Sequence, residues 1–128
     1  MNSLNWSVVV AGAVALGVVS PVAAHHSHAM FDHTKQASVS GTVTSFDYRN
    51  PHVGLYLDVD NAGKKVNYWV EMSNVQNMIR RGIGHGTFKP GDKVTVTLHP
   101  LKDGRPGGNY ETLTTADGRA FGREPDVR

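Results

Sequence analysis

The chain has 128 residues, which is enough for one domain with one modest core. It has no cysteine, which excludes disulfides, thiolate metal sites and cysteine nucleophiles, so any metal would need nitrogen or oxygen ligands. The formal net charge is +2 and the basic residues are scattered, so we expect no nucleic-acid partner.

The first segment has the features of a secretory signal peptide. Residues 8–19 are apolar and uncharged but too short to span a bilayer comfortably, and small residues follow up to Ala24, where a signal peptidase would cut. We therefore predict a signal peptide over residues 1–24 and a periplasmic or secreted protein of 104 residues with no stable membrane insertion. Because residues 1–6 offer only the terminal amine as positive charge, an uncleaved anchor stays open as the alternative.

A histidine-rich segment, residues 25–36, follows the predicted cut and leads into the first strand. It holds four of the seven histidines within nine positions: His25, His26, His28 and His33. A free terminal amine beside imidazoles suits copper(II), because nitrogen ligands and tetragonal geometry agree with the affinity order of the divalent metals. His52, fixed behind Pro51, would add an imidazole from the folded domain. The candidate metal ligands are therefore His25, His26, His28 and His52; the alternative is an exposed polar arm that binds no cofactor.

Alternating apolar residues predict three strands before the middle of the chain. In the first, over residues 37–48, the alternation changes phase between Val43 and Phe46, which indicates a bulge or bend that Gly41 would ease. Residues 53–60 and 64–71 then form a hairpin around a turn at residues 61–63. In the register that we expect, Trp69 lies opposite Gly54 and protects it.

A short helix is predicted after the hairpin. Ser73 and Gln76 have the spacing of a capping box, and Gly82 would end the helix. Three apolar residues share one face of it: Val75, Met78 and Ile79. Arg80 and Arg81 fall in its last turn, where the helix dipole favours positive charge, so they need no anionic partner.

The remaining elements complete a barrel. A fourth strand over residues 94–99 follows a turn at residues 89–92, and we expect His99 and the loop residue His85 to be surface residues. A glycine-rich loop at residues 102–108 precedes a fifth strand over residues 110–115, and Asp117-Gly118 predicts a hairpin back to residues 120–121. This order is typical of a mainly β, five-stranded OB-like barrel with one helix between strands three and four, here over residues 37–122, with a frayed tail at 123–128.

The rest of the sequence offers little chemistry. No nucleophile elbow, phosphate loop or HExxH spacing occurs, so we expect no enzyme activity. Tyr56 and Trp69 share the outer face of the predicted hairpin and form an alternative ligand face for a saccharide or peptide. Their structural interpretation is that they fix the register and protect the sheet edge.

Seven short motifs in chain order resemble those of a family of small exported bacterial proteins, domain of unknown function 6152. They are His25-His26-Ser27, Phe31-Asp32, Gly41-Thr42-Val43, Asn50-Pro51-His52, Trp69-Val70-Glu71, Lys89-Pro90-Gly91-Asp92 and Asp117-Gly118-Arg119. The resemblance covers nearly all of the chain after the predicted cut. It implies a secreted, periplasmic, all-β module and brings no activity and no site residues. The expected partner is an unidentified envelope protein or small ligand.

Overall fold

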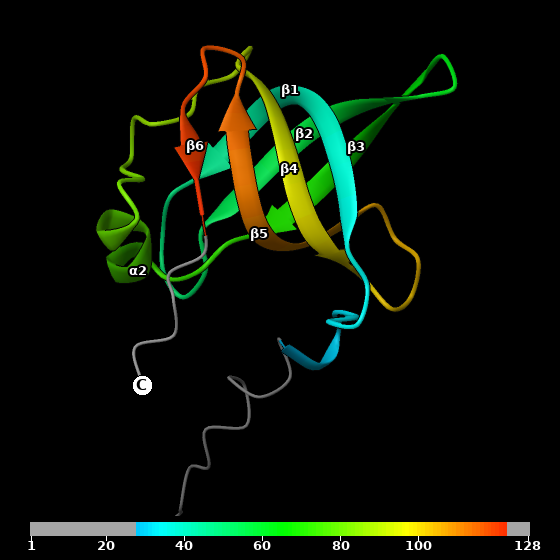
Figure 1. Cartoon of the computed structure of the whole chain (residues 1–128), viewed down its shortest axis with the longest axis horizontal. Coiled ribbons are helices and arrows are strands. Elements are labelled where there is room, and N and C mark those ends of the chain that lie inside the picture. The colour runs from blue at the N-terminus through cyan, green and yellow to red at the C-terminus, as the bar shows by residue number, and fades with distance from the viewer. Residues whose placement is uncertain (1–27, 123–128) are drawn as a thin grey trace, which may run out of the picture.

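The computed structural model describes residues 28–122. The predicted signal peptide, His25, His26 and the tail at residues 123–128 lie outside the described residues. Within this range the named elements are six strands and one short helix (Figure 1). They are β1 (Ala37–Asp47), β2 (Gly54–Asn61), β3 (Lys64–Glu71), α2 (Val75–Arg80), β4 (Lys93–Pro100), β5 (Gly107–Thr115) and β6 (Ala120–Phe121).

The first five strands close into a barrel. The sheet order is β3-β2-β1-β4-β5-β6, and β3 also pairs with β5, which joins the two ends of the five-stranded sheet (Figure 1). This last pairing is parallel and short, with Trp69–Glu71 against Gly107–Asn109, and we call it the closing seam. The other neighbours pair in antiparallel fashion. The predicted OB-like barrel, with one short helix between its third and fourth strands, is confirmed.

Strand β1 bends, and its two parts pair with different strands of the barrel. Its first part pairs with β4 and its second with β2, and the two pairings overlap at Gly41 and Thr42. The register with β2 shifts between Val43 and Ser45, which is the bulge that the change of phase predicts. A Cβ atom on Gly41 would lie 2.7 Å from the carbonyl oxygen of Asp58, so glycine is required where the strands cross.

Glycine also makes the closing seam. The predicted boundary between the loop at residues 102–108 and the fifth strand is wrong, because β5 already begins at Gly107. A Cβ atom on Gly107 would lie 2.2 Å from the Trp69 carbonyl oxygen, and one on Gly108 would lie 2.3 Å from that of His99. Both neighbouring strands approach β5 this closely only because these residues have no side chain.

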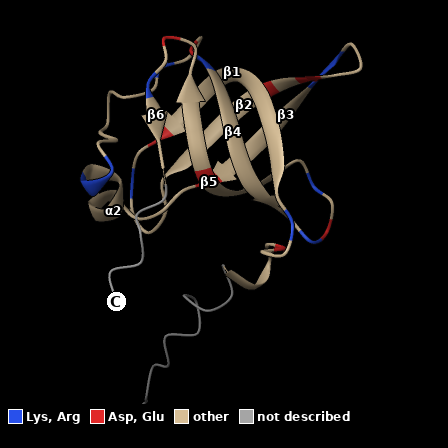
Figure 2. Ribbon diagram, viewed as in Figure 1, with Lys and Arg blue, Asp and Glu red and all other residues tan. Residues whose placement is uncertain are grey.

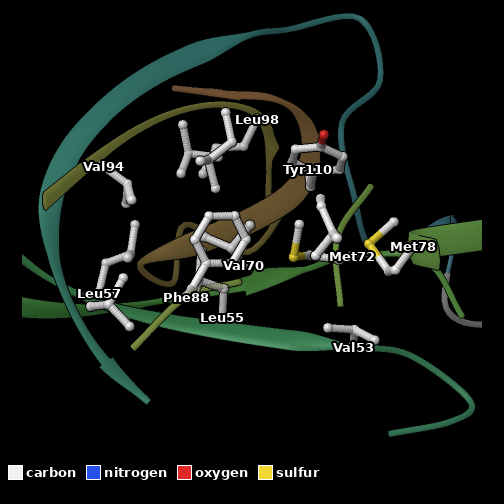
Figure 3. Close-up of a cluster of buried hydrophobic side chains, with 14 of the residues drawn as sticks. Val53, Leu55, Leu57, Val70, Met72, Met78, Phe88, Val94, Leu98 and Tyr110 are labelled. Atoms are coloured by element: carbon white, nitrogen blue, oxygen red, sulfur yellow. The ribbon is translucent and has the colours of Figure 1, made fainter. Parts of the chain in front are cut away.

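The barrel interior is filled by apolar side chains from every barrel strand (Figure 3). Residues at or below 1% exposure include Val43, Leu55, Leu57, Val70, Val96, Leu98 and Leu113. Met78 of α2 and Phe88 of the following loop pack into the same cluster. The alternation that marks the strands in the sequence therefore corresponds to the core face.

The β2–β3 hairpin has the predicted faces but a different register. Asn61 pairs with Lys64 around a two-residue turn, in which Ala62 and Gly63 have φ of 54° and 84°. Every cross-strand pair is therefore shifted by two positions, and Trp69 lies opposite Tyr56 instead of Gly54. A shift of two keeps each side chain on its face. Trp69 still covers Gly54 diagonally, since its Nε1 atom is 3.6 Å from the Cβ position of that glycine.

The helix begins one residue later than predicted. Its N-cap is Asn74, whose side chain accepts a hydrogen bond from the Asn77 amide at 2.8 Å, so the capping box at Ser73 is wrong. Met78 is buried as expected, but Ile79 is 55% exposed. Arg80 lies in the last turn, whereas Arg81 is the C-cap, and Gly82 follows it with φ of 78°.

Charges of both signs are mixed over the turns and strand ends (Figure 2). Four basic side chains pair with an aspartate two or three residues away: Lys35 with Asp32, Arg49 with Asp47, Arg105 with Asp103, and Arg119 with Asp117. Each of these basic side chains therefore has an aspartate as a local ion-pair partner. No helix within residues 28–122 has the length and apolar content that crossing a membrane requires.

Candidate functional site

The described part of the histidine-rich segment is docked on the barrel. Phe31 is 1% exposed, forms an antiparallel bridge with Leu101, and its ring centroid lies 6.1 Å from that of Trp69. Backbone hydrogen bonds flank the bridge, from the Asp32 amide to the Pro100 carbonyl at 2.8 Å and from the Lys102 amide to the Met30 carbonyl at 2.9 Å. The segment therefore holds His28 against the end of the barrel.

His28 lines a cleft of about 80 Å³ together with residues from four other parts of the chain. The other lining residues are His52, Glu71, Met72, Ser73, Arg81, Asn109 and Tyr110. His52 Nδ1 lies 3.7 Å from Glu71 Oε1, and the Glu71 side chain is only 7% exposed, against 37% for His52. Two of the four candidate metal ligands, His28 and His52, therefore line the same cleft, and His52 lies beside the buried Glu71 carboxylate.

His52 is positioned by the connection between β1 and β2. The Asn50–Pro51 peptide bond is cis, and the Asn50 side chain accepts a hydrogen bond from the Val75 amide at 2.9 Å. Val53 exchanges backbone hydrogen bonds with Met72 and Ser73 at 2.8 and 3.0 Å. These contacts attach the loop that carries His52 to the segment between β3 and α2.

The closing seam supplies Glu71 and Asn109. These two residues are directly paired across β3 and β5, and Asn109 Nδ2 donates to the Glu71 carbonyl oxygen at 3.3 Å. Neither was predicted as a site residue, because a parallel pairing between distant strands leaves no periodic signal in the sequence. A carboxylate at the last position of a strand, just before a helix cap, was the one available hint.

A second group of histidines ties the docked segment to β4 and β5. The ring centroids of His33 and His99 are 4.9 Å apart, and His99 is 7% exposed. Its Nδ1 atom lies 2.7 Å from the Lys35 carbonyl oxygen, and its Nε2 atom lies 3.2 Å from a Glu111 carboxylate oxygen. The prediction that His99 is a surface residue is wrong, since the docked segment covers this end of β4. His85 is exposed, as predicted.

No three histidine, aspartate or glutamate side chains within residues 28–122 are placed to hold a metal ion together. His25 and His26, the other two candidate ligands, lie outside the described residues. His28 and His52 line one cleft, but they form no metal site there with another described side chain.

Tyr56 and Trp69 do not form an open platform. They are directly opposite each other on β2 and β3, both are half-buried, and Phe31 packs on Trp69. Tyr56 instead lines a shallow surface hollow with polar residues of β1 and with Asn67. The alternative ligand face is therefore partly occupied by the chain itself.

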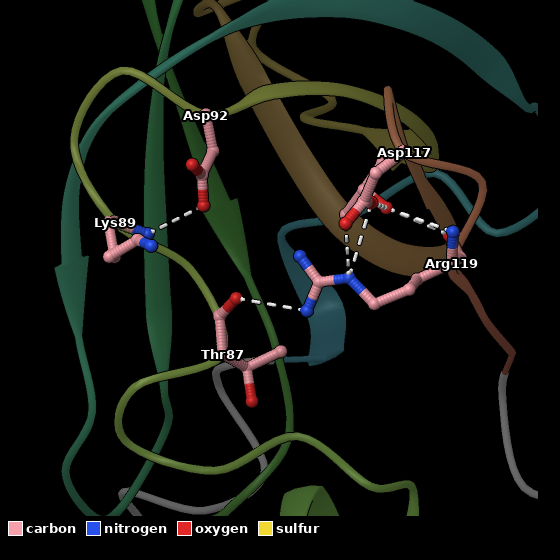
Figure 4. Close-up of polar contacts among 6 residues, drawn as sticks. Thr87, Lys89, Asp92, Asp117 and Arg119 are labelled. Carbon is pink, nitrogen blue, oxygen red and sulfur yellow. Dashed lines mark hydrogen bonds and ion pairs between the residues drawn. The ribbon is translucent and has the colours of Figure 1, made fainter.

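Two of the sequence motifs have structural roles away from the cleft (Figure 4). In the turn at residues 89–92, the Lys89 amide donates to the Asp92 carboxylate at 2.9 Å. In the β5–β6 turn, Asp117 accepts from Thr115 and from Arg119, and these hydrogen bonds lower its pKa, the Thr115 bond more strongly. Arg119 also donates to the Thr87 carbonyl oxygen at 3.5 Å, which links the β5–β6 turn to the loop that precedes residues 89–92.

A model of a family of unknown function (DUF6152) matches residues 12–110. The match spans the docked segment, the cleft residues and the barrel up to Tyr110. No curated protein and no solved structure matches the chain.

Proposed function

We propose that this chain, which belongs to the family of unknown function DUF6152, is an exported, non-enzymatic protein that binds a copper-type ion. The terminal amine and the imidazoles of His25 and His26 would be the first ligands, and His28 and His52 would complete the set. Glu71 would offset the charge of the ion.

The observation that carries the proposal is the meeting of His28 and His52 in one cleft. They come from segments more than 20 residues apart, and each segment is attached to the barrel by its own hydrogen bonds. His26 precedes His28 by two residues, which span at most about 7 Å, so the proposed site takes its further imidazole from the adjoining sequence.

The chemistry of the donors favours copper over other divalent ions. The chain has no cysteine, and the proposed ligands are nitrogen atoms, which bind copper(II) most tightly among the first-row metals. The buried Glu71 carboxylate beside His52 can orient the ring that it faces, as carboxylates next to ligating histidines do.

The test has two stages. Mass analysis of the exported protein fixes its first residue, and copper(II) titration then compares this protein with a form that retains one added residue before His25. We expect the added residue, and separately His52→Ala, to weaken binding by about 10- to 100-fold. His85→Ala, which removes an exposed loop imidazole, is the matched control and should bind normally. Equal affinity of the processed and extended forms would contradict an amine-dependent site.

A second candidate function, saccharide binding, is favoured by a groove of about 450 Å³ on the outer face of β1. Its walls carry hydroxyl groups of Ser40, Thr95 and Thr114 and the charged groups of Asp58 and Lys93. Ser40 and Thr95 share a hydrogen bond of 2.7 Å between β1 and β4. Titration with soluble oligosaccharides, followed by NMR shifts of Thr95 and Thr114, tests it; shifts confined to other faces would argue against it.

A further inference from the structure

Arg81 holds a guanidinium N–H group that the fold leaves unsatisfied. Its Nε atom is buried, and it is the only such buried side-chain nitrogen or oxygen among residues 28–122 that has no hydrogen-bond partner. The guanidinium group stays charged in proteins and has no acceptor capacity, so only an acceptor atom of another group can satisfy it. Buried polar groups without a partner are rare and call for a specific explanation.

Packing explains where Arg81 lies but not the unsatisfied N–H. The guanidinium carbon is 5.8 Å from the centroid of the Tyr110 ring, a cation–π contact that holds the side chain inward. Arg80, the preceding residue, is exposed instead, and its Nη1 atom lies 3.4 Å from Asn77 Oδ1. The two adjacent arginines therefore occupy different environments, and only Arg81 lines the cleft.

We propose that the cleft binds a small oxyanion, a carboxylate or phosphate group, with Arg81 as its principal donor. The cleft volume of about 80 Å³ suits a group of a few heavy atoms. Imidazoles of His28 and His52 and the amide of Asn109 line the same space and offer further N–H groups. Arginine binds planar oxyanions through parallel hydrogen bonds, which lysine cannot make.

Glu71 is the one carboxylate among the lining residues. Its carboxylate lies 3.7 Å from His52 Nδ1, and no hydrogen bond satisfies Arg81 Nε. The inference goes beyond the proposed function, because it requires only the metal-free protein.

The test uses the processed full chain, freed of metal with a chelator that is then removed by desalting. The protein is titrated with inorganic phosphate and separately with acetate, at constant ionic strength set by chloride, and binding is followed by calorimetry and by NMR shifts of Asn109. We expect saturable binding at one site. Arg81→Ala and Arg81→Gln should weaken it by about 10-fold or more, and Arg80→Ala, the matched control, should leave it unchanged. The relative affinities of phosphate and acetate identify the preferred group.

Two results would overturn the proposal. One is that binding of neither phosphate nor acetate saturates, and the other is that Arg81→Gln binds them with unchanged affinity. If Arg81→Ala does not fold, Arg81→Gln, which keeps most of the side-chain stem, decides alone. A shortened chain that ends at Gly122 tests whether the protein's own tail binds Arg81. The sequence after Gly122 contains two carboxylates, Glu124 and Asp126. Gly122 itself lies near the cleft residue Tyr110, because its carbonyl oxygen accepts a hydrogen bond from Tyr110 Oη at 2.9 Å. Binding only by this shortened chain would assign Arg81 to the protein's own tail and reject a free oxyanion.

Discussion

Replacing Phe31 by alanine should release the docked segment from the barrel. Phe31 is 1% exposed and is held between Leu101 and Trp69. An aromatic side chain of this kind buries about 150–250 Å², which at roughly 25 cal/mol per Å² corresponds to about 4–6 kcal/mol as an upper estimate. Measured Phe→Ala changes in cores cost about 3–5 kcal/mol, so we expect a loss in that range.

Most of this free energy should be lost from the docking equilibrium of residues 28–36, because this segment can leave the barrel while the barrel strands stay paired. Each 1.4 kcal/mol is a tenfold change in an equilibrium constant, so about 3 kcal/mol would raise the undocked fraction by roughly 150-fold. His28 leaves the cleft with the segment. Any ion binding that needs both His28 and His52 should weaken accordingly.

Tryptophan fluorescence provides the assay. The chain has two tryptophans, and since Trp6 lies in the predicted signal peptide, Trp69 alone would report in the processed protein. We expect Phe31→Ala to shift the Trp69 emission to the red and to speed hydrogen exchange at the Lys102 amide, which donates to Met30. Phe121→Ala is the control, since Phe121 packs on Phe88 instead, with centroids 5.5 Å apart. Unchanged Trp69 emission and Lys102 exchange in Phe31→Ala would refute the reasoning.

Three further predictions concern the seam and two titrating groups. Gly107→Ala places a Cβ atom 2.2 Å from the Trp69 carbonyl oxygen and should cost about 3 kcal/mol or more in urea unfolding, whereas Gly86→Ala, which meets nothing within 4 Å, should be nearly neutral. The pKa of Asp32 is lowered from 3.8 to about 2 by hydrogen bonds from Thr34 and by Lys35, so this turn should keep its stabilisation at pH 4 and lose it as the pH falls towards 2; an NMR titration with an Asp32 midpoint near 4 would contradict this. Burial raises the pKa of Tyr110 from 10.0 to about 12, so one tyrosine should ionise late in an alkaline absorbance titration, and the stability that its neutral form provides should be lost between pH 10 and pH 12.

Local patterns predict much of this fold because neighbouring residues decide it. Alternation locates the strands, the phase change after Val43 marks the bulge of β1, and Gly82 ends the helix. The hairpin register was wrong by two because registers that differ by two positions fit the same alternation, and the positive φ values of Ala62 and Gly63 fix the turn of two residues.

The candidate site was harder to predict because it is made by contacts between distant residues. His28 and His52 could be named from residue type and position, but nothing local indicates that they share a cleft. Glu71 and Asn109 meet only through a parallel pairing, and Arg81 resembled an ordinary helix-end residue. His99 was predicted to be exposed because its burial depends on a segment more than 60 residues earlier in the chain.

The position of Phe31 also determines when the cleft can exist during folding. Its binding surface is built from Trp69 and Leu101, so docking joins residues separated by about 70 positions, a long-range contact of the kind that forms late. A chain that has emerged only as far as β4 already contains His28 and His52 but lacks Leu101 and Asn109. Incomplete chains therefore cannot assemble this cleft, and ligand capture there can begin only once nearly the whole domain is available.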